Sequence, residues 1–163
     1  MIKADAVLSE IKKNGVTHVV GVPDNGSRSL YQMLWDDPDI RVIPVTREGE
    51  AFALASGLFL GGKRPIVLIQ NTGFFESGDA FRGTVHNMTI PLVMIVGWRG
   101  YATMSGKGPV DTAATFFEPV LKAWKVPYYM MRSSEESGLI SRAFSECSDI
   151  SLPVAVIYHG EMD

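Results

Sequence analysis

The chain has 163 residues, of which 46% are hydrophobic and 20% charged, and its formal net charge at pH 7 is −3. These values are typical of one globular domain, and they exclude a basic field for nucleic acid or an anionic membrane surface. A single cysteine, Cys147, excludes an internal disulfide and a cysteine-rich metal site. The longest apolar run, IPLVMIVGW, is too short to span a bilayer, and the charged N-terminal segment does not resemble a signal peptide, so we expect a cytoplasmic protein.

Helical spacing of apolar residues alternates with short β-branched runs along the chain. The first predicted helix covers residues 4–15 and ends at a glycine, and the strand at 16–23 ends at a proline. Ser27 or Ser29 is placed to cap the next helix, and Pro119 is expected to kink or restart a later one. The remaining segments follow in order: helix 27–38, strand 40–45, helix 48–62, strand 64–70, helix 77–87, strand 90–97, helix 111–124, strand 126–131, helix 133–147 and strand 152–158.

This alternation predicts an α/β fold. Several of the strands are continuously apolar, which is the pattern of strands buried on both faces of a parallel sheet. Right-handed crossovers place helices on both sides of such a sheet. We therefore predict a single three-layer domain over residues 1–163, with a six-stranded, mostly parallel sheet. Ligands bind at the carboxyl ends of the strands in these folds, here the segments GVPDNGS, PVTREGE, IQNTGFFESGD and VGWRGYATMSGKG.

Several familiar motifs are absent. The segment GYATMSGKG resembles a phosphate-binding loop, but Gly108 stands where that loop needs Ser or Thr to hold magnesium. Pro23 stands where a dinucleotide-binding fold needs its second glycine, and no G-x-S-x-G nucleophile elbow occurs. The three histidines lack metal-ligand spacing. We predict no metal site in this chain, structural roles for His18 and His159, and a helix-surface position for His86.

Three segments resemble, in order and spacing, the pyrimidine-binding domain of thiamine-diphosphate enzymes. They are GVPD at residues 21–24, VTREGEAFALASGLFLGGKRPIVLIQNTG at 45–73 and IPLVMIVGWRG at 90–100. Within that family the motifs are most similar to those of the sulfopyruvate and phosphonopyruvate decarboxylases, from about Ile2 to Tyr129. The resemblance implies a six-stranded parallel sheet, thiamine diphosphate as cofactor, and decarboxylation of a small, anionic 2-oxo acid.

Glu48 begins the apolar helix that follows the second predicted strand. An acidic residue in the first turn of a helix is favoured by the helix dipole, so one interpretation of Glu48 is structural, and Glu50 fits the same role. The resemblance implies another, because Glu48 aligns with the family's cofactor-activating glutamate, with Gly57 nine residues further on. Such a glutamic acid hydrogen-bonds a pyrimidine nitrogen and promotes removal of the proton from the thiazolium carbon. We predict catalysis for Glu48 and the structural role for Glu50.

The resemblance also implies cofactor contacts in two loops. VPDNG approaches the pyrimidine side of the cofactor in relatives, although it is also an ordinary turn sequence and departs from the usual Gly-Val-Pro-Asp-Ser. QNTG aligns with the loop that touches the pyrimidine ring, while FFESGD departs from the usual continuation. The predicted cofactor-binding residues are Pro23, Asp24, Asn25, Asn71, Thr72, Gly73 and Phe74, the last as a packing residue.

An anionic substrate tail calls for a fixed cation, because charge-assisted hydrogen bonds are the strong ones. Arg99 in GWRG and Lys107 in SGKG are the candidates by position, and a solvated loop charge is the alternative for each. GWRG matches the phosphonopyruvate decarboxylases, but YATMSGKGPVDT replaces the Asp-Glu-Pro-Gln-His that usually follows. The identity of the substrate is therefore less well determined than that of the cofactor.

Family members bind the diphosphate through Mg²⁺ on a second domain, the PP domain, marked by Gly-Asp-Gly and by paired asparagines further on. These 163 residues contain only the fragment SGDAF. We therefore expect a partner (beta) subunit to carry the PP domain and the magnesium, in an assembly of two copies of each chain or more. Two alternatives stay open: a subunit of another thiamine-diphosphate lyase or ligase, such as an acetolactate-synthase-like system, and a non-catalytic α/β regulatory module, against which the presence of Glu48 counts.

Overall fold

All six strands of the central sheet run parallel, in the order β2-β1-β3-β4-β6-β5. The computed structural model describes residues 2–163. Each strand coincides with one of the apolar runs in the sequence, so the predicted α/β class and the number of strands are confirmed. The strands are β1 (His18–Gly21), β2 (Arg41–Pro44), β3 (Pro65–Gln70), β4 (Val93–Gly97), β5 (Tyr128–Met130) and β6 (Val154–Tyr158).

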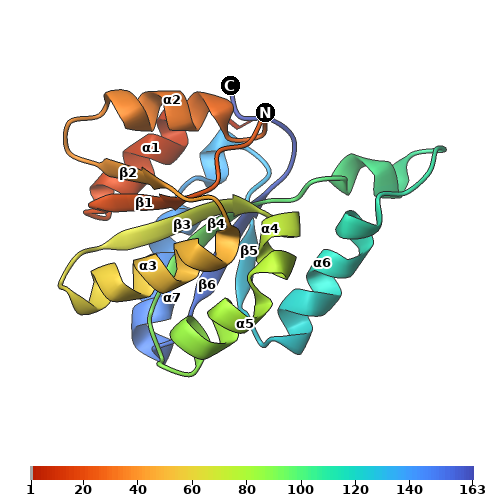
Figure 1. Cartoon of the computed structure of the whole chain (residues 1–163). Helices are drawn as coiled ribbons and strands as arrows, with labels where there is room; N and C mark the ends of the chain where they lie inside the picture. Colours follow the sequence, from red (N-terminus) through yellow and green to blue (C-terminus); the bar gives the residue numbers. More distant parts are fainter. Residues whose placement is uncertain (1) are drawn as a thin grey trace.

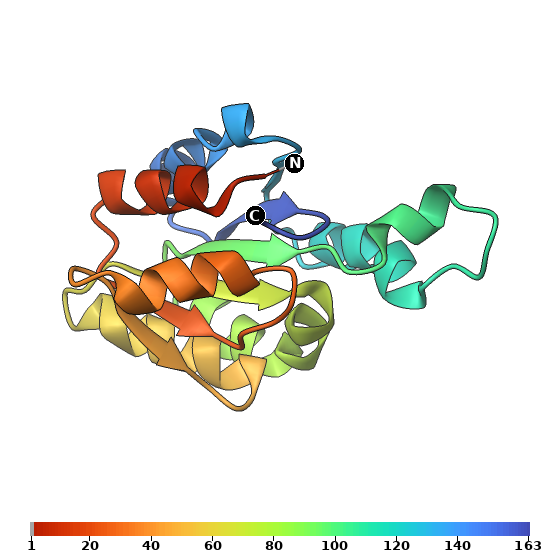
Figure 2. The same cartoon turned by 90° about the horizontal axis from the view of Figure 1, so that it is seen from above.

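Helices cover both faces of the sheet (Figures 1 and 2). One face carries α1, α2 and α7, and the other carries α3, α4, α5 and α6. The α-helices are α1 (Ala4–Lys13), α2 (Arg28–Asp36), α3 (Glu48–Leu60), α4 (Asn71–Glu76), α5 (Gly78–Ala80), α6 (Thr112–Ala123) and α7 (Leu139–Ile150). A π-helix, η1 (Phe81–His86), and two 3₁₀ helices, η2 (Tyr101–Ser105) and η3 (Ser134–Glu136), complete the elements.

Side chains that alternate along the central strands form two separate cores. On β3, Ile66 and Leu68 pack with α1, α2 and α7, whereas Val67 and Ile69 pack with the helices of the opposite face. All residues of β4 and β6 are buried, while the edge strands β2 and β5 keep partly exposed side chains. The three layers predicted from the continuously apolar runs are therefore present.

Local details depart from the sequence-based predictions. The helix expected at 77–87 is the short α5 followed by the π-helix η1. Pro119 neither ends nor restarts α6, which continues through this exposed position to Ala123. Ser27 is the residue before α2, but its hydroxyl donates to Asp24 and caps no helix N–H. The helix expected from Ser133 begins at Leu139, after a separate 3₁₀ turn.

Candidate active site

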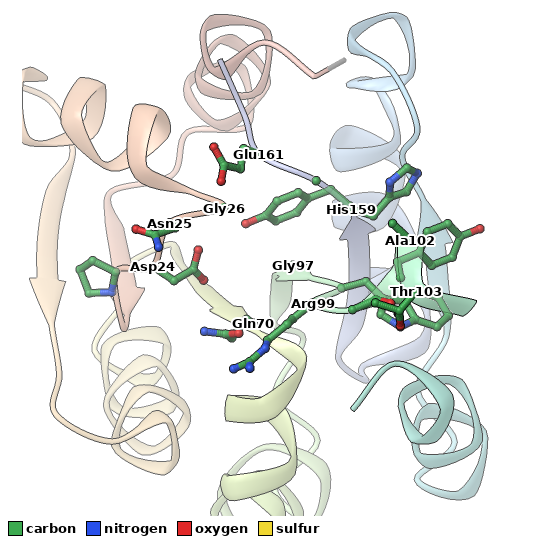
Figure 3. Close-up of a pocket in the computed structure, with 16 residues that line it drawn as sticks. Asp24, Asn25, Gly26, Gln70, Gly97, Arg99, Ala102, Thr103, His159 and Glu161 are labelled. Atoms are coloured by element: carbon green, nitrogen blue, oxygen red, sulfur yellow. The ribbon is translucent and has the colours of Figure 1, made fainter. Parts of the chain in front are cut away.

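A pocket of about 780 Å³ lies at the carboxyl ends of β1, β3, β4 and β6 (Figure 3). Its walls are the loop 23–26 after β1, Gln70 at the end of β3, residues 97–103 after β4 and residues 158–161 after β6. Parallel strands bring their carboxyl ends to the same edge of a sheet, so segments far apart in the sequence meet here. Three of the four loops that the sequence analysis selected contribute to the pocket or to its border.

Asp24 is held by the turn that follows β1. Its Oδ1 accepts hydrogen bonds from the backbone N–H of Ser27 at 3.0 Å and from the Ser27 hydroxyl at 3.1 Å. This arrangement fixes the carboxylate at the pocket wall, and Figure 3 shows the side chain of Asp24 directed into the pocket. Asp24 can therefore serve both the predicted turn and the predicted ligand contact. Its Oδ1 stabilises the turn, and its Oδ2 has no hydrogen-bond partner in the described residues.

Glu48 is the first residue of α3, three residues after Val45 and close to the end of β2. Its side chain lies against Gly73 of α4, where a Cβ atom would stand 2.5 Å from Cδ of Glu48 and closer still to Cγ and Oε1. Within residues 2–163, no hydrogen bond or ion pair engages the Glu48 carboxylate. The glycine thus leaves room for a half-buried carboxyl group that has no structural partner.

Two other carboxylates serve the N-terminus of α3. Glu50 Oε2 accepts from the backbone N–H of Thr46 at 3.2 Å and from its hydroxyl at 3.1 Å. Glu76, on α4, accepts from the backbone N–H of Gly49 at 2.9 Å and pairs with Arg47. The Gly49 N–H and then the Arg47 guanidinium lower the pKa of Glu76. Glu76 therefore satisfies an N–H in the first turn of α3, and Glu50 holds the residue before the N-cap, so Glu48 has neither structural role.

The segment QNTG joins the last residue of β3, Gln70, to the first three residues of α4, so it is not the loop that the resemblance implied. Asn71 is buried, and its amide donates to the carbonyl oxygens of Arg99 at 3.2 Å and Ala113 at 3.0 Å. Phe74 is also buried, within a cluster of aromatic rings that includes Phe52 and Phe81. Both side chains therefore build the scaffold and line no part of the pocket, whereas Thr72 remains partly exposed and Gly73 faces Glu48.

The structure separates the two cations that were predicted to meet the substrate. Arg99 lines the pocket and forms a 3.4 Å ion pair with Asp111, with 63% of its side chain exposed. In Figure 3 it points toward Gln70. Lys107 is exposed, lies outside the pocket, and belongs to a segment that extends away from the sheet (Figure 2). Lys107 is therefore a solvent-exposed loop charge, and Arg99 is the one of the two candidates that lines the pocket.

Comparison with known proteins places the chain in a family. Residues 1–116 match the model of the thiamine pyrophosphate enzyme, N-terminal TPP binding domain. The chain belongs to the thiamine pyrophosphate enzymes. Its sequence is 31% identical to the sulfopyruvate decarboxylase subunit alpha of Methanococcus maripaludis, over 96% of this chain and 94% of that protein. It is 37% identical to the phosphonopyruvate decarboxylase of Streptomyces viridochromogenes, over 61% of this chain and 25% of that one.

Solved structures share the fold of this TPP-binding domain. Benzoylformate decarboxylase from Polynucleobacter necessarius superposes with a TM-score of 0.76 at 20% identity, over 97% of this chain and 30% of that one. A putative thiamin diphosphate-dependent enzyme from Mycobacterium smegmatis gives a TM-score of 0.73 at 18% identity. The chain therefore spans about 30% of the length of these enzymes.

The residues of the TPP-binding domain fit one end of thiamine diphosphate. A free carboxyl group beside a bare glycine suits a planar ring that carries hydrogen-bonding nitrogen atoms, as at Glu48 and Gly73. Within residues 2–163, no group of three or more His, Cys, Asp or Glu side chains could hold a metal ion. The same part of the chain contains no helix with the length and apolarity needed to cross a membrane. The Glu48 carboxyl group is therefore the feature of this domain that suits the pyrimidine end of the cofactor.

Sequence reasoning missed the wall that follows β6. Tyr158, His159 and Glu161 all line the pocket. His159, which was predicted to be structural, stacks on Tyr101 with ring centroids 4.4 Å apart and an interplanar angle of 19°. The rule that ligands bind at strand carboxyl ends applies to β6 as well, and its application to residues 158–161 would have found them.

Proposed function

We propose that this chain is the pyrimidine-domain subunit of a two-subunit, thiamine-diphosphate-dependent 2-oxo acid decarboxylase of the sulfopyruvate or phosphonopyruvate type. The observation that carries the proposal is the Glu48 carboxylate, which is held against Gly73 without any bond of its own. The similarity over nearly the whole length of proteins named sulfopyruvate decarboxylase subunit alpha supports the same assignment.

Glu48 would hold a proton at its carboxyl group and share it with a pyrimidine ring nitrogen. A carboxyl group can both donate and accept that proton, which suits a general acid–base role. Gly73 has no side chain, and this leaves the space that the Glu48 carboxyl group occupies. The Arg47–Glu76 ion pair fixes the start of α3. When bound, thiamine diphosphate supplies the electron sink that lets a 2-oxo acid lose its carboxylate.

A partner subunit would complete the site. The 163 residues contain no Gly-Asp-Gly followed by paired asparagines. In phosphate-binding sites, one or two protein carboxylates usually bind Mg²⁺, and the metal in turn binds the phosphate oxygens. We place these groups on a PP-domain subunit, with two copies of each chain or more in the assembly. Around the cofactor, Pro23, Asp24, Asn25 and Thr72 stay candidates for contact, and Asn71 and Phe74 would act by supporting α4.

Reconstitution tests the proposal. This chain mixed with a PP-domain subunit, thiamine diphosphate and Mg²⁺ should release CO₂ from 3-sulfopyruvate or 3-phosphonopyruvate, whereas either chain alone should be inactive. Assays of CO₂ and of the aldehyde product separate the possible outcomes. Equal release of CO₂ and aldehyde supports a decarboxylase, condensation products in place of aldehyde support a ligase, and an inactive but stable complex would contradict the enzymatic assignment.

Arg99 is the residue proposed to meet the anionic tail of the substrate. Because it lines the pocket and Lys107 does not, Arg99→Ala should raise KM for 3-sulfopyruvate about tenfold or more, the usual scale for one charge-assisted hydrogen bond. Lys107→Ala is the matched control and should leave KM unchanged. Steady-state kinetics with 3-sulfopyruvate and with uncharged pyruvate check this, and an equal effect of Arg99→Ala on both substrates would argue against tail binding.

A further inference from the structure

Two buried side-chain oxygens of residues that line the pocket make no hydrogen bond in the part of the chain described. They are Oδ2 of Asp24 and the hydroxyl of Tyr158. Tyr158 ends β6 with 1% of its surface exposed, and both residues line the pocket. Buried polar groups in folded proteins are nearly always bonded, so two unbonded oxygens in one pocket call for a ligand group.

A backbone position without a side chain lies beside the Tyr158 hydroxyl and beside the other oxygen of the Asp24 carboxylate, Oδ1, which already accepts from Ser27. A Cβ atom on Gly26 would stand 3.2 Å from Oδ1 of Asp24, 3.3 Å from the Tyr158 hydroxyl and 3.4 Å from the carbonyl oxygen of Gly160. The φ of Gly26 is outside the left-handed region, so the backbone alone does not require glycine here. Gly97 also lies against this phenol, since a Cβ there would be 2.8 Å from the hydroxyl. Oxygens from three separate segments therefore surround a position without a side chain.

The charges and hydrogen-bonding capacities of Asp24, Tyr158 and the Gly160 carbonyl determine which kind of ligand group can bind between them. Burial and then the nearby charge of Asp24 raise the pKa of Tyr158 well above its ordinary value, and a contact with the Ser27 side chain, which falls outside hydrogen-bond geometry, opposes them only in part. The phenol therefore stays protonated and can donate or accept. A carboxylate and a carbonyl oxygen accept only. An anionic group would be repelled by Asp24, whereas an N–H or O–H group would satisfy the acceptors.

We propose that Asp24, Tyr158 and the Gly160 carbonyl form an acceptor site for a single N–H or O–H group, and that Gly26 is small so that this group can reach it. The site deepens the proposed function and rests on it for the identity of the pocket as an active site. It orients the ligand, because the donor end then lies at Asp24 and the anionic tail at Arg99. The donor has two possible sources, an ordered water molecule or a group of the cofactor or substrate.

Kinetics of the assembled enzyme test the site. Tyr158→Phe removes the hydroxyl, and Gly26→Ala fills the position between the oxygens without removing any of them. Each change should lower kcat/KM about tenfold or more, while the variants still assemble as the wild type does. Tyr129→Phe is the matched control, since that hydroxyl is bonded to Glu146 on α7 outside the pocket, and it should have no effect. Values of kcat/KM for Tyr158→Phe within twofold of wild type would overturn the proposal.

Thermal unfolding of the isolated chain separates the two sources. If a water molecule fills the site, Tyr158→Phe should melt below wild type, because a hydrogen-bonded hydroxyl has been lost. If the donor arrives with the ligand, the variant should melt at the same temperature or above it, because an unpaired buried group has been removed. If the assembled wild type proves inactive, the proposed function fails and melting alone decides: a lower value supports the site, and an equal or higher one overturns it.

Discussion

Replacing Glu48 by glutamine is expected to lower kcat of the assembled enzyme by about 100-fold or more, the usual contribution of a general acid–base residue. The amide has the same shape as the carboxyl group, but it cannot donate a proton and take it back. Because no hydrogen bond or ion pair within residues 2–163 depends on the Glu48 carboxylate, the fold and the assembly should be unaffected. Steady-state kinetics, with circular dichroism and size-exclusion chromatography on the same samples, measure these quantities separately.

Glu50→Gln is the matched control for this experiment. Glu50 lies two residues away on the same helix and uses Oε2 to accept from the N–H and hydroxyl of Thr46. A glutamine carbonyl oxygen can accept the same two bonds, so turnover should stay within about twofold of wild type. Full activity in Glu48→Gln, or an equal loss in both variants, would contradict the catalytic assignment of Glu48.

Gly73→Ala is expected to separate stability from activity. Gly73 lies in α4 with helical backbone geometry, where alanine is favoured over glycine by up to about 1 kcal/mol. The added methyl group, however, would overlap the Glu48 side chain, whose flexible end must then move away. A misplacement of about 1 Å in a catalytic group costs on the order of 100-fold in rate. We therefore expect a melting temperature close to wild type together with a loss of kcat on that scale.

Gly138→Ala provides the corresponding control. Gly138 precedes α7, has helical backbone angles, and has open space where a Cβ would be added. Its substitution should leave kcat unchanged. If Gly73→Ala kept full turnover, the contact between Gly73 and Glu48 would have no catalytic importance. If instead it unfolded the chain, the overlap would be relieved by the backbone and not by the glutamate side chain.

Much of the fold could be predicted because its signals are local. A continuous apolar run such as PIVLIQ, without alternation, is buried on both faces, and only a parallel sheet covered by helices on both sides provides that environment. Glu48 by itself fits a structural role at a helix start, as Glu50 does, and only the family resemblance singled it out. The structure adds that Glu50 holds Thr46 and Glu76 holds the Gly49 N–H, so Glu48 does neither.

The remaining parts of the site depend on contacts between distant segments. Asn71 was predicted to face the cofactor, but its amide bonds to carbonyl groups 28 and 42 residues further along the chain, which no local pattern reveals. Tyr158 looked like one more residue of an apolar strand, and its unpaired hydroxyl becomes visible only when Asp24 and Gly26 lie beside it. The segment after Gln70 was predicted as a loop because QNTG aligns with a cofactor-binding loop of the family, yet α4 forms there, packed against aromatic rings.

The central claim is that this chain supplies one half of a shared cofactor site. Isothermal titration calorimetry of thiamine diphosphate with Mg²⁺ tests it most directly, first with the isolated chain and then with the chain mixed with a PP-domain subunit. In this account the partner subunit holds the diphosphate through the metal, and the described residues contain no group of three or more His, Cys, Asp or Glu side chains that could hold a metal ion. We predict no measurable heat of binding for the isolated chain and saturable, magnesium-dependent binding for the mixture. Tight, magnesium-dependent binding by this chain alone would contradict the claim.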